Sequence, residues 1–347
     1  MRLVTRTFLI CGAVAALTLS SGISAQQPTA PQGGGLEILH VAGNVYLFAG
    51  TGANVVVQAS EEGAVIVDAS SERVSDQLLA EIRKLTTRPI RYVINTSADI
   101  DHIGGNDRLA AAGRNFATPA PDLAGRGAGG GGGRGGGNGL RPTGAQIYAH
   151  EGALQRLSAP TGQASAAPVA LWPTDTFFTM KKTLSFNGEG IELLHQPNAH
   201  TDGDLIVWFR RSDVVAAGDV YTPDRFPMID LARGGSIQGM LDALNGLIDI
   251  TVPRFNQQGG TMVVPGHGRI SNESDVVEYR DMATIVRDRI QRMINQKMTL
   301  EQVRAANPVL DYEGVYGRNT TWTTAMFVEA VYRDLSNPSR RSANASR

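Results

Sequence analysis

The apolar positions of this chain repeat with two different periods. Short apolar runs bounded by turn residues are typical of strands, and apolar positions three or four residues apart are typical of helices. Runs of the first kind predict strands at 44–49, 54–58, 64–68, 90–95, 145–149, 181–186, 190–196, 204–209, 213–217 and 261–264. Helical spacing predicts helices at 75–85, 151–157, 237–250, 274–297 and 321–335, and a capping box at Thr299 predicts a short helix after it.

The predicted elements fall into two successive rounds of strands and helices. Gly-containing turns at 50–52 and 61–63 separate the first three strands, so we expect an antiparallel meander there. A helix then leads to the strand 90–95, which ends at the segment 97–106, the position where α/β proteins carry functional residues. The second round closes with the strand 261–264. This order predicts an α/β fold of two packed sheets flanked by helices.

The first 25 residues have the three-part plan of a secretory signal peptide. Arg2 and Arg6 precede an apolar run and then small residues that end at Ala25. The apolar run is about twelve residues long, shorter than the roughly 20 that span a bilayer. We therefore expect cleavage after Ala25, a secreted or periplasmic protein, and no stable membrane insertion.

The remaining chain divides by composition. We expect a linker at 26–35, a domain at 36–272, C-terminal helices at 273–335 and a disordered tail at 336–347. The domain is interrupted at 125–139, where 11 of 15 residues are glycine. Glycine cannot offset its ordering entropy by burying a side chain, so this insertion is predicted to be a mobile surface loop.

Charge and cysteine content narrow the classes of function. Lys and Arg (32) nearly balance Asp and Glu (33), so no overall field favours nucleic acid, and a small-molecule substrate is expected. The oligomeric state stays open. Cys11 is the only cysteine and lies in the predicted signal peptide, which excludes disulfides and thiolate ligands from the mature chain. Any metal must be held by His, Asp, Glu or neutral oxygen.

Three histidines and an aspartate follow the ends of predicted strands. His102, His200 and His267 each lie among Gly, Asp, Thr or Pro, and Asp219 follows the strand 213–217. Loops at strand ends are where a rigid sheet presents metal ligands. The other histidines lie in a strand-like run or at a helix start and are expected to be structural: His40, His150 and His195.

In order, strand context and spacing, these motifs resemble the metallo-β-lactamase superfamily over nearly the whole mature chain. The matching segments are Ile66-Val67-Asp68-Ala69-Ser70, Asn95-Thr96, Asp101-His102-Ile103-Gly104-Gly105-Asn106, His200-Thr201-Asp202-Gly203-Asp204, Gly218-Asp219 and Pro265-Gly266-His267-Gly268. The resemblance implies a four-layer αββα sandwich with a C-terminal helical extension. It also implies a metal site at one edge of the two sheets.

The resemblance implies two metal positions that share Asp219. Site two would take Asp101, His102 and His267, and all three are present. His200 would belong to site one together with the first two histidines of the family's His-x-His-x-Asp-His box.

Site one departs from the family. The box reads Ser97-Ala98-Asp99-Ile100-Asp101-His102 in this chain, and a serine hydroxyl is a poor zinc ligand compared with imidazole. The change either leaves site one empty, weakens it, or favours a harder ion held by Asp99, Asp219 and His200. We expect one zinc ion in site two; a second zinc ion, or manganese or iron, are the alternatives.

A metal-dependent hydrolase of a small ester, lactone, thioester or amide is the predicted function. One metal ion polarises a carbonyl or lowers the pKa of a bound water toward about 7. Asp101 would position the attacking water, and Asp99 or His200 would accept its proton; Asp99 is equally expected as a turn residue or helix N-cap. The alternative is a non-catalytic binding protein of the same fold.

Two further interpretations concern the surroundings of the site. Asp68 and Asp204 are expected to orient ligand histidines. The segment from Tyr221 to Arg233 is expected either to line a substrate entrance or to be a surface loop.

Overall fold

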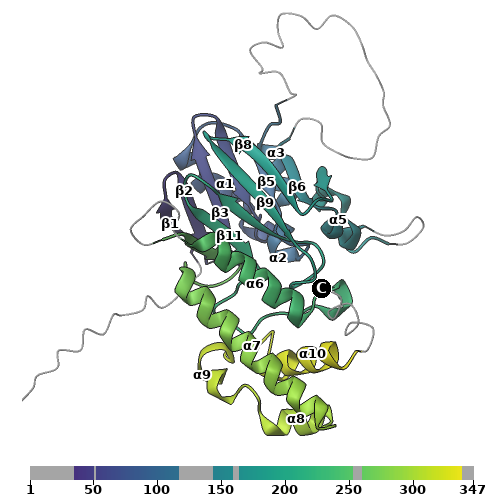
Figure 1. Ribbon diagram of the computed structural model, residues 1–347. Helices are drawn as coiled ribbons and strands as arrows, with labels where there is room; N and C mark the ends of the chain where they lie inside the picture. The colour runs from purple at the N-terminus through teal and green to yellow at the C-terminus, as the bar shows by residue number, and fades with distance from the viewer. Residues whose placement is uncertain (1–34, 51, 117–143, 159–163, 253–259, 338–347) are drawn as a thin grey trace, which may run out of the picture. The chain divides into compact units, whose positions relative to one another are not determined.

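The computed structural model describes residues 35–50, 52–116, 144–158, 164–252 and 260–337 (Figure 1). The predicted signal peptide (1–25), the linker up to residue 34, the Gly-rich insertion (125–139) and the tail from residue 338 lie outside the described residues. None of the described helices is both long enough and apolar enough to cross a membrane.

The first sheet has seven strands in the described chain, ordered β1 to β7 as in the sequence. They are β1 (Glu37–Ala42), β2 (Val45–Ala49), β3 (Val55–Ser60), β4 (Gly63–Val67), β5 (Ile90–Ile94), β6 (Gln146–His150) and β7 (Asp175–Phe177). β2 to β4 form the antiparallel meander that the turns predicted, and β1, which was not among the predicted strands, pairs antiparallel with β2. β4 to β7 are parallel. The sequence pattern missed β7, a three-residue edge strand too short to show a period.

The second sheet has five strands in the described chain, in the order β12-β11-β10-β9-β8. They are β8 (Lys181–Phe186), β9 (Glu189–Gln196), β10 (Asp204–Phe209), β11 (Val214–Gly218) and β12 (Met262–Pro265). Neighbours from β8 to β11 are antiparallel, and β11 and β12 are parallel. Because β9, β11 and β12 therefore run the same way, their carboxyl ends meet at one edge of this sheet.

Hydrophobic clusters define four layers. Side chains from both sheets, such as Leu47 and Ile94 of the first and Leu193 and Val207 of the second, form one buried cluster between them. The outer face of the first sheet packs on α1 (Ser75–Leu85) and α3 (Asn106–Ala112). The outer face of the second packs on α6 (Ile237–Thr251) and α7 (Glu273–Asn295), which lie side by side (Figure 1). The fold is the expected αββα sandwich.

The C-terminal helices join the cluster that α6 and α7 form. α10 (Thr324–Ser336) packs against α7 and α8 (Leu300–Ala306), and α8 begins with the predicted capping box at Thr299. α10 starts three residues later than predicted, because Thr323 is its N-cap and accepts a hydrogen bond from Met326 N. The remaining short elements are α2 (Ile100–Ile103), α5 (Glu151–Leu157), α9 (Glu313–Tyr316) and the 3-10 helices η1 (Glu72–Val74), η2 (Val169–Leu171), η3 (Leu231–Arg233) and η4 (Leu310–Tyr312).

Candidate metal centre

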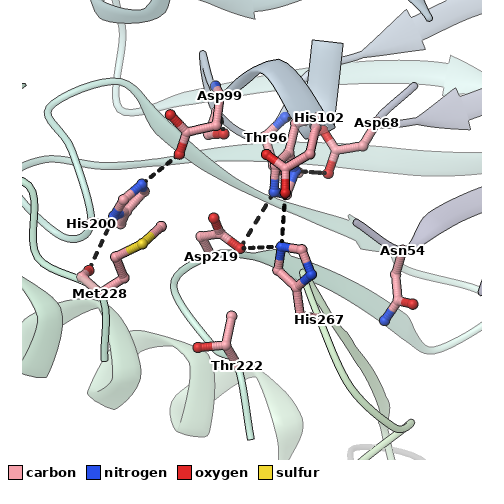
Figure 2. A network of polar contacts seen from close by, with 12 residues as sticks. Asn54, Asp68, Thr96, Asp99, His102, His200, Asp219, Thr222, Met228 and His267 are labelled. Carbon is pink, nitrogen blue, oxygen red and sulfur yellow. Dashed lines mark hydrogen bonds and ion pairs between the residues drawn. The ribbon is translucent and has the colours of Figure 1, made fainter. Parts of the chain in front are cut away.

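The polar residues that follow the strand ends converge at one edge of the sandwich (Figure 2). Asp68 follows β4, the segment 97–102 follows β5, His200 lies between β9 and β10, Asp219 follows β11 and His267 follows β12. A hydrogen bond from Leu205 N to Thr96 O (2.7 Å) joins the two sheets at this edge. The structure therefore brings together all the residues that the sequence singled out as metal ligands.

His102 is fully buried and its ring is oriented by Asp68. Its Nδ1 lies 2.8 Å from Asp68 Oδ2, and Asp68 also accepts hydrogen bonds from Thr96 N (2.8 Å) and Thr96 Oγ1 (2.7 Å). A carboxylate only accepts, so the ring proton lies on Nδ1 and the Nε2 atom faces the pocket. The predicted orienting role of Asp68 matches this contact.

Four ligand atoms face one another around this pocket. His102 Nε2 lies 3.4 Å from Asp219 Oδ1, and His267 Nε2 lies 3.2 Å from Asp101 Oδ2 and 3.7 Å from Asp219 Oδ1. Bonds of 2.0–2.2 Å in a tetrahedral zinc site place neighbouring ligand atoms about 3.3–3.6 Å apart. The spacing of the predicted site-two ligands thus fits a single metal ion.

Two of these atoms are buried without a hydrogen-bond partner. In the described part of the chain, His102 Nε2 and Asp219 Oδ1 both lack one, although buried polar atoms are almost always bonded. Burial lowers the pKa of His102, but the charges of Asp68 and Asp219 outweigh it and raise that pKa well above its ordinary value. The pocket therefore favours a positive charge at this place, which a divalent cation supplies.

The turn that carries His267 is fixed by Asn54, a residue that the sequence analysis missed. Asn54 N donates to Gly266 O (2.8 Å), and Asn54 Nδ2 donates to Pro265 O and Gly268 O (3.0 Å each). Asn54 precedes β3 in the first sheet, whereas the turn follows β12 in the second. No local pattern could reveal a contact between residues more than 200 positions apart.

Glycine allows the loops to approach the carboxylate of Asp219. Gly218 has a φ of +53°, and a Cβ there would lie 2.5 Å from Thr96 Oγ1. A Cβ on Gly266 would lie 2.4 Å from Asp219 Oδ1. Only glycine therefore fits these two positions beside the site.

Site one contains an ion-pair network where the family has histidines. Ser97 Oγ accepts a hydrogen bond from Asp99 N (3.2 Å) and so stabilises the turn before α2. Asp99 is the N-cap of α2 by position, but its side chain does not cap the helix. Asp99 Oδ2 lies 2.7 Å from His200 Nε2, and Asp99 Oδ1 contacts Arg233 Nη1.

His200 is fully buried and held from both sides of its ring. Its Nδ1 lies 3.1 Å from Met228 O and its Nε2 faces Asp99. Burial lowers the pKa of His200, but the hydrogen bond to Asp99 and the neighbouring carboxylates raise it to about 9. Asp204, which was expected to orient a ligand histidine, accepts hydrogen bonds from Thr201 N (2.7 Å) and Thr201 Oγ1 (2.5 Å) and so fixes the loop that carries His200. The carbonyl of Met228 orients the His200 ring.

Arg233 ends the segment that was expected to line a substrate entrance or to be a surface loop, but its contact with Asp99 was not predicted. Its Nε donates to Asp230 Oδ2 (2.7 Å), and Asp230 also accepts from Ala232 N and Arg233 N (2.9 Å each). Burial raises the pKa of Asp99, but the hydrogen bonds and charges of His200 and Arg233 outweigh burial and hold this pKa below its ordinary value. An arginine in a loop has no sequence signature that marks it as such a partner.

A cleft of about 440 Å³ opens beside His200. Its walls are apolar at Met228, Leu231, Trp322 and Met326, and charged at Arg233 and Arg333. The segment from Tyr221 to Arg233 is thus more than a surface loop: Tyr221 and Phe226 are buried, and its later residues line the cleft together with the C-terminal helix α10.

The three remaining histidines contact structural partners, as predicted. His40 Nε2 bonds to Gly43 O (2.9 Å), and His195 Nε2 bonds to Asp202 O (2.9 Å). His150 is the N-cap of α5, accepts a hydrogen bond from Gly152 N (3.2 Å), and stacks on His195 with ring centroids 3.4 Å apart.

Known proteins of two kinds resemble this chain. A linear primary-alkylsulfatase of Pseudomonas sp. is 24% identical over 272 residues, which cover 70% of this chain and 47% of that protein. The structure of an inverting sec-alkylsulfatase of Pseudomonas sp. is similar with a TM-score of 0.60, 15% identity, and coverage of 89% of this chain and 52% of the other. This chain thus spans about half the length of either sulfatase.

A metallo-β-lactamase of Pontibacter korlensis shares the fold over a shorter part of this chain. Its structure has a TM-score of 0.50 and 16% identity, and the match covers 72% of this chain and 99% of the other. The profile of the metallo-beta-lactamase superfamily matches residues 48–267, more than half of the chain and the whole range from Asp68 to His267 that forms the site. The chain belongs to the metallo-β-lactamase superfamily.

Proposed function

We propose that the protein is a metal-dependent hydrolase that uses one divalent ion, with zinc as the first candidate. The observation that carries the proposal is the pair of buried atoms without hydrogen-bond partners in the described chain, His102 Nε2 and Asp219 Oδ1, with His267 and Asp101 beside them. Two imidazoles and two carboxylates form a complete ligand set for zinc, manganese or iron. A bound ion supplies Lewis acidity and makes a water molecule nucleophilic near neutral pH.

The chain's own residues hold and orient the reacting groups. Asp101 has a side chain that is 39% exposed, and we assign to it the hydrogen bond that positions the attacking water. Of the two predicted proton acceptors, Asp99 is the one we assign, because both ring nitrogens of His200 donate to acceptor oxygens (Met228 O and Asp99 Oδ2) and its pKa is raised to about 9. The 2.7 Å contact with His200 holds the Asp99 carboxylate in position. Since Met228 and Arg233 occupy their other polar atoms, this pair is fixed in place during the reaction.

The cleft beside His200 supports a small substrate with an apolar portion. Met228, Leu231, Trp322 and Met326 offer apolar contacts, and the rest of the substrate would reach the metal ligands past His200. The predicted substrates are esters, lactones, thioesters and amides. Because two of the similar proteins are alkylsulfatases, we add sulfate esters of apolar alcohols to this proposal.

The test compares the mature chain with two histidine variants on a panel of these substrates. His267→Ala removes a ligand and should lower kcat/KM on the order of 10²-fold or more, together with the bound metal. His40→Ala removes an exposed histidine whose hydrogen bond is to Gly43 O, and should retain full activity. Equal activity in wild type and His267→Ala would rule out the proposed function.

The second candidate function is a non-catalytic binding protein, which Ser97 and the Asp99 ion pair favour. The two candidates differ in metal content. Refolding in excess zinc, manganese or iron should give about one ion per chain for the hydrolase. A chain that takes up no metal from any of the three would support the binding protein.

We also propose that residues 1–25 direct the protein to the periplasm or out of the cell. The basic residues and the apolar run of this segment support the proposal. N-terminal sequencing of protein recovered from the periplasm should begin at Gln26, and a full-length cytoplasmic product would contradict it.

A further inference from the structure

We infer that Arg233 takes the place of a first metal ion, so that this chain binds a single divalent ion at the pocket of Asp101, His102, Asp219 and His267. The inference rests on the proposed metal site, but ion counting tests it independently of activity. It concerns a second set of ligand-type residues, Asp99, His200 and Asp219, whose oxygen and nitrogen atoms lie within 4.8 Å of one another. Figure 2 shows Asp219 with Asp99 and His200 on one side and His102 and His267 on the other.

By residue type alone, this second set could hold another ion. Its atoms, however, are already engaged with protein groups. Asp99 uses Oδ2 for His200 Nε2 (2.7 Å) and Oδ1 for Arg233 Nη1. Asp99 stands where the family has a histidine, and each of its two carboxylate oxygens thus already has a partner. A second ion would have to displace the contact between His200 and Asp99, because it needs His200 Nε2 as a ligand, and it would lie beside the guanidinium of Arg233.

Arg233 is held in this position by its own loop. Its Nε bonds to Asp230 Oδ2 (2.7 Å), its carbonyl accepts from Asp202 N (3.0 Å), and Asp230 N donates to His200 O (2.9 Å). Gly234 ends η3 in the left-handed region (φ +89°), where its close approach to Asp202 leaves little room for a side chain. The loop that places His200 at the site is therefore bonded to the loop that places Arg233.

The charge of Arg233 accounts for a carboxylate at position 99, where the family has a histidine. A guanidinium stays charged at all ordinary pH values and matches a carboxylate in shape. The Arg233 side chain is 28% exposed and that of Asp99 only 14%, so water screens the pair weakly. A divalent cation a few ångströms from this guanidinium would be repelled, whereas Asp219 remains available to the ion on its other side.

The experiment counts metal ions in chelator-treated protein that is re-equilibrated with excess zinc, by elemental analysis after gel filtration. Wild type should hold about one ion per chain, and Arg233→Ala should hold about two, because the charge that repels a second ion is gone and zinc can then displace the proton between His200 Nε2 and Asp99 Oδ2. Arg233→Gln should behave like Arg233→Ala. Arg233→Lys, which keeps the charge, should hold about one.

Arg333→Ala is the matched control, because Arg333 lines the same cleft but is paired with Glu329. It should hold the same single ion as wild type. Two ions in wild type, or one ion in both folded Arg233→Ala and Arg233→Gln, would overturn the inference. A wild type that binds one ion but hydrolyses nothing would refute the proposed hydrolase and leave the role of Arg233 standing.

Discussion

The carboxylate of Asp68 orients His102, the fully buried histidine of the proposed metal pocket. Asp68 is 3% exposed and accepts three hydrogen bonds, two from Thr96 and one from His102 Nδ1. In Asp68→Asn, one oxygen becomes an NH₂ donor that faces a donor. The substitution therefore leaves at least one buried donor without an acceptor and releases the His102 ring from its fixed orientation.

The expected loss has two parts. Leaving a buried donor unpaired should lower the free energy of unfolding of the metal-free chain by about 1–3 kcal/mol. Loss of the partner that orients a ligand histidine should weaken metal binding about 10- to 100-fold, which corresponds to about 1.4–2.7 kcal/mol. Urea unfolding of the metal-free chain measures the first part, and competition with a chelating dye of known zinc affinity measures the second.

Asp204→Asn is the matched control. Asp204 is 2% exposed and accepts hydrogen bonds from the backbone N and the hydroxyl of Thr201, just as Asp68 accepts them from the backbone N and the hydroxyl of Thr96. Asp204 differs from Asp68 because His102 donates to Asp68 and not to Asp204. We expect a similar loss of stability and a change in zinc affinity of less than about threefold. Equal zinc affinities of the two variants would refute the assignment of His102 as a ligand oriented by Asp68.

Three further perturbations have expected outcomes. Gly218→Ala places a Cβ 2.5 Å from Thr96 Oγ1 at a φ of +53° and should lower the free energy of unfolding by about 2 kcal/mol or more. The control Gly246→Ala, on the open face of α6, should raise the free energy of unfolding by up to about 1 kcal/mol. Equal urea midpoints of the two variants would contradict this prediction. Removing metal with a chelator should lower Tm by several degrees, since an ion at 100 times its Kd contributes about 2.7 kcal/mol, and calorimetry should show no such shift in His267→Ala. Burial and His195 lower the pKa of His150 to about 4, below the ordinary value of about 6.5, so the fold should lose stability as pH falls between these values. His150→Asn keeps a side-chain acceptor for Gly152 N and should show a smaller drop in urea midpoint from pH 7.5 to 5; an equal drop would dismiss the role of His150.

Much of the fold was predictable because its signals are local. α1, β8 and β10 begin and end at the predicted residues, since each has a clear pattern of apolar positions. The start of α10 was placed too early because apolar spacing continues upstream of its cap, Thr323. The three-residue strand β7 was missed because it contains too few positions for a period.

The candidate site was predictable in its residue types and only in part in its contacts. Chain order and motif spacing marked Asp101, His102, Asp219 and His267, because these residues lie in short motifs within the segments that follow strands. The roles of Asn54 and Arg233 depend on contacts across more than 100 residues of sequence. Such contacts have no local pattern, so sequence analysis passed over both.

The sequence by itself determined the family resemblance, the candidate ligands after the strands, and the replacement of two histidines of the His-x-His-x-Asp-His box by Ser97 and Asp99. Each of these features can be recognised in a short stretch of consecutive residues. Only the tertiary structure decided which contacts these replacements make. It places Arg233 and His200 against the two carboxylate oxygens of Asp99, and it leaves His102 Nε2 and Asp219 Oδ1 facing each other 3.4 Å apart. The physical reason is that charge compensation depends on distance in space, and the packing of the two sheets sets that distance.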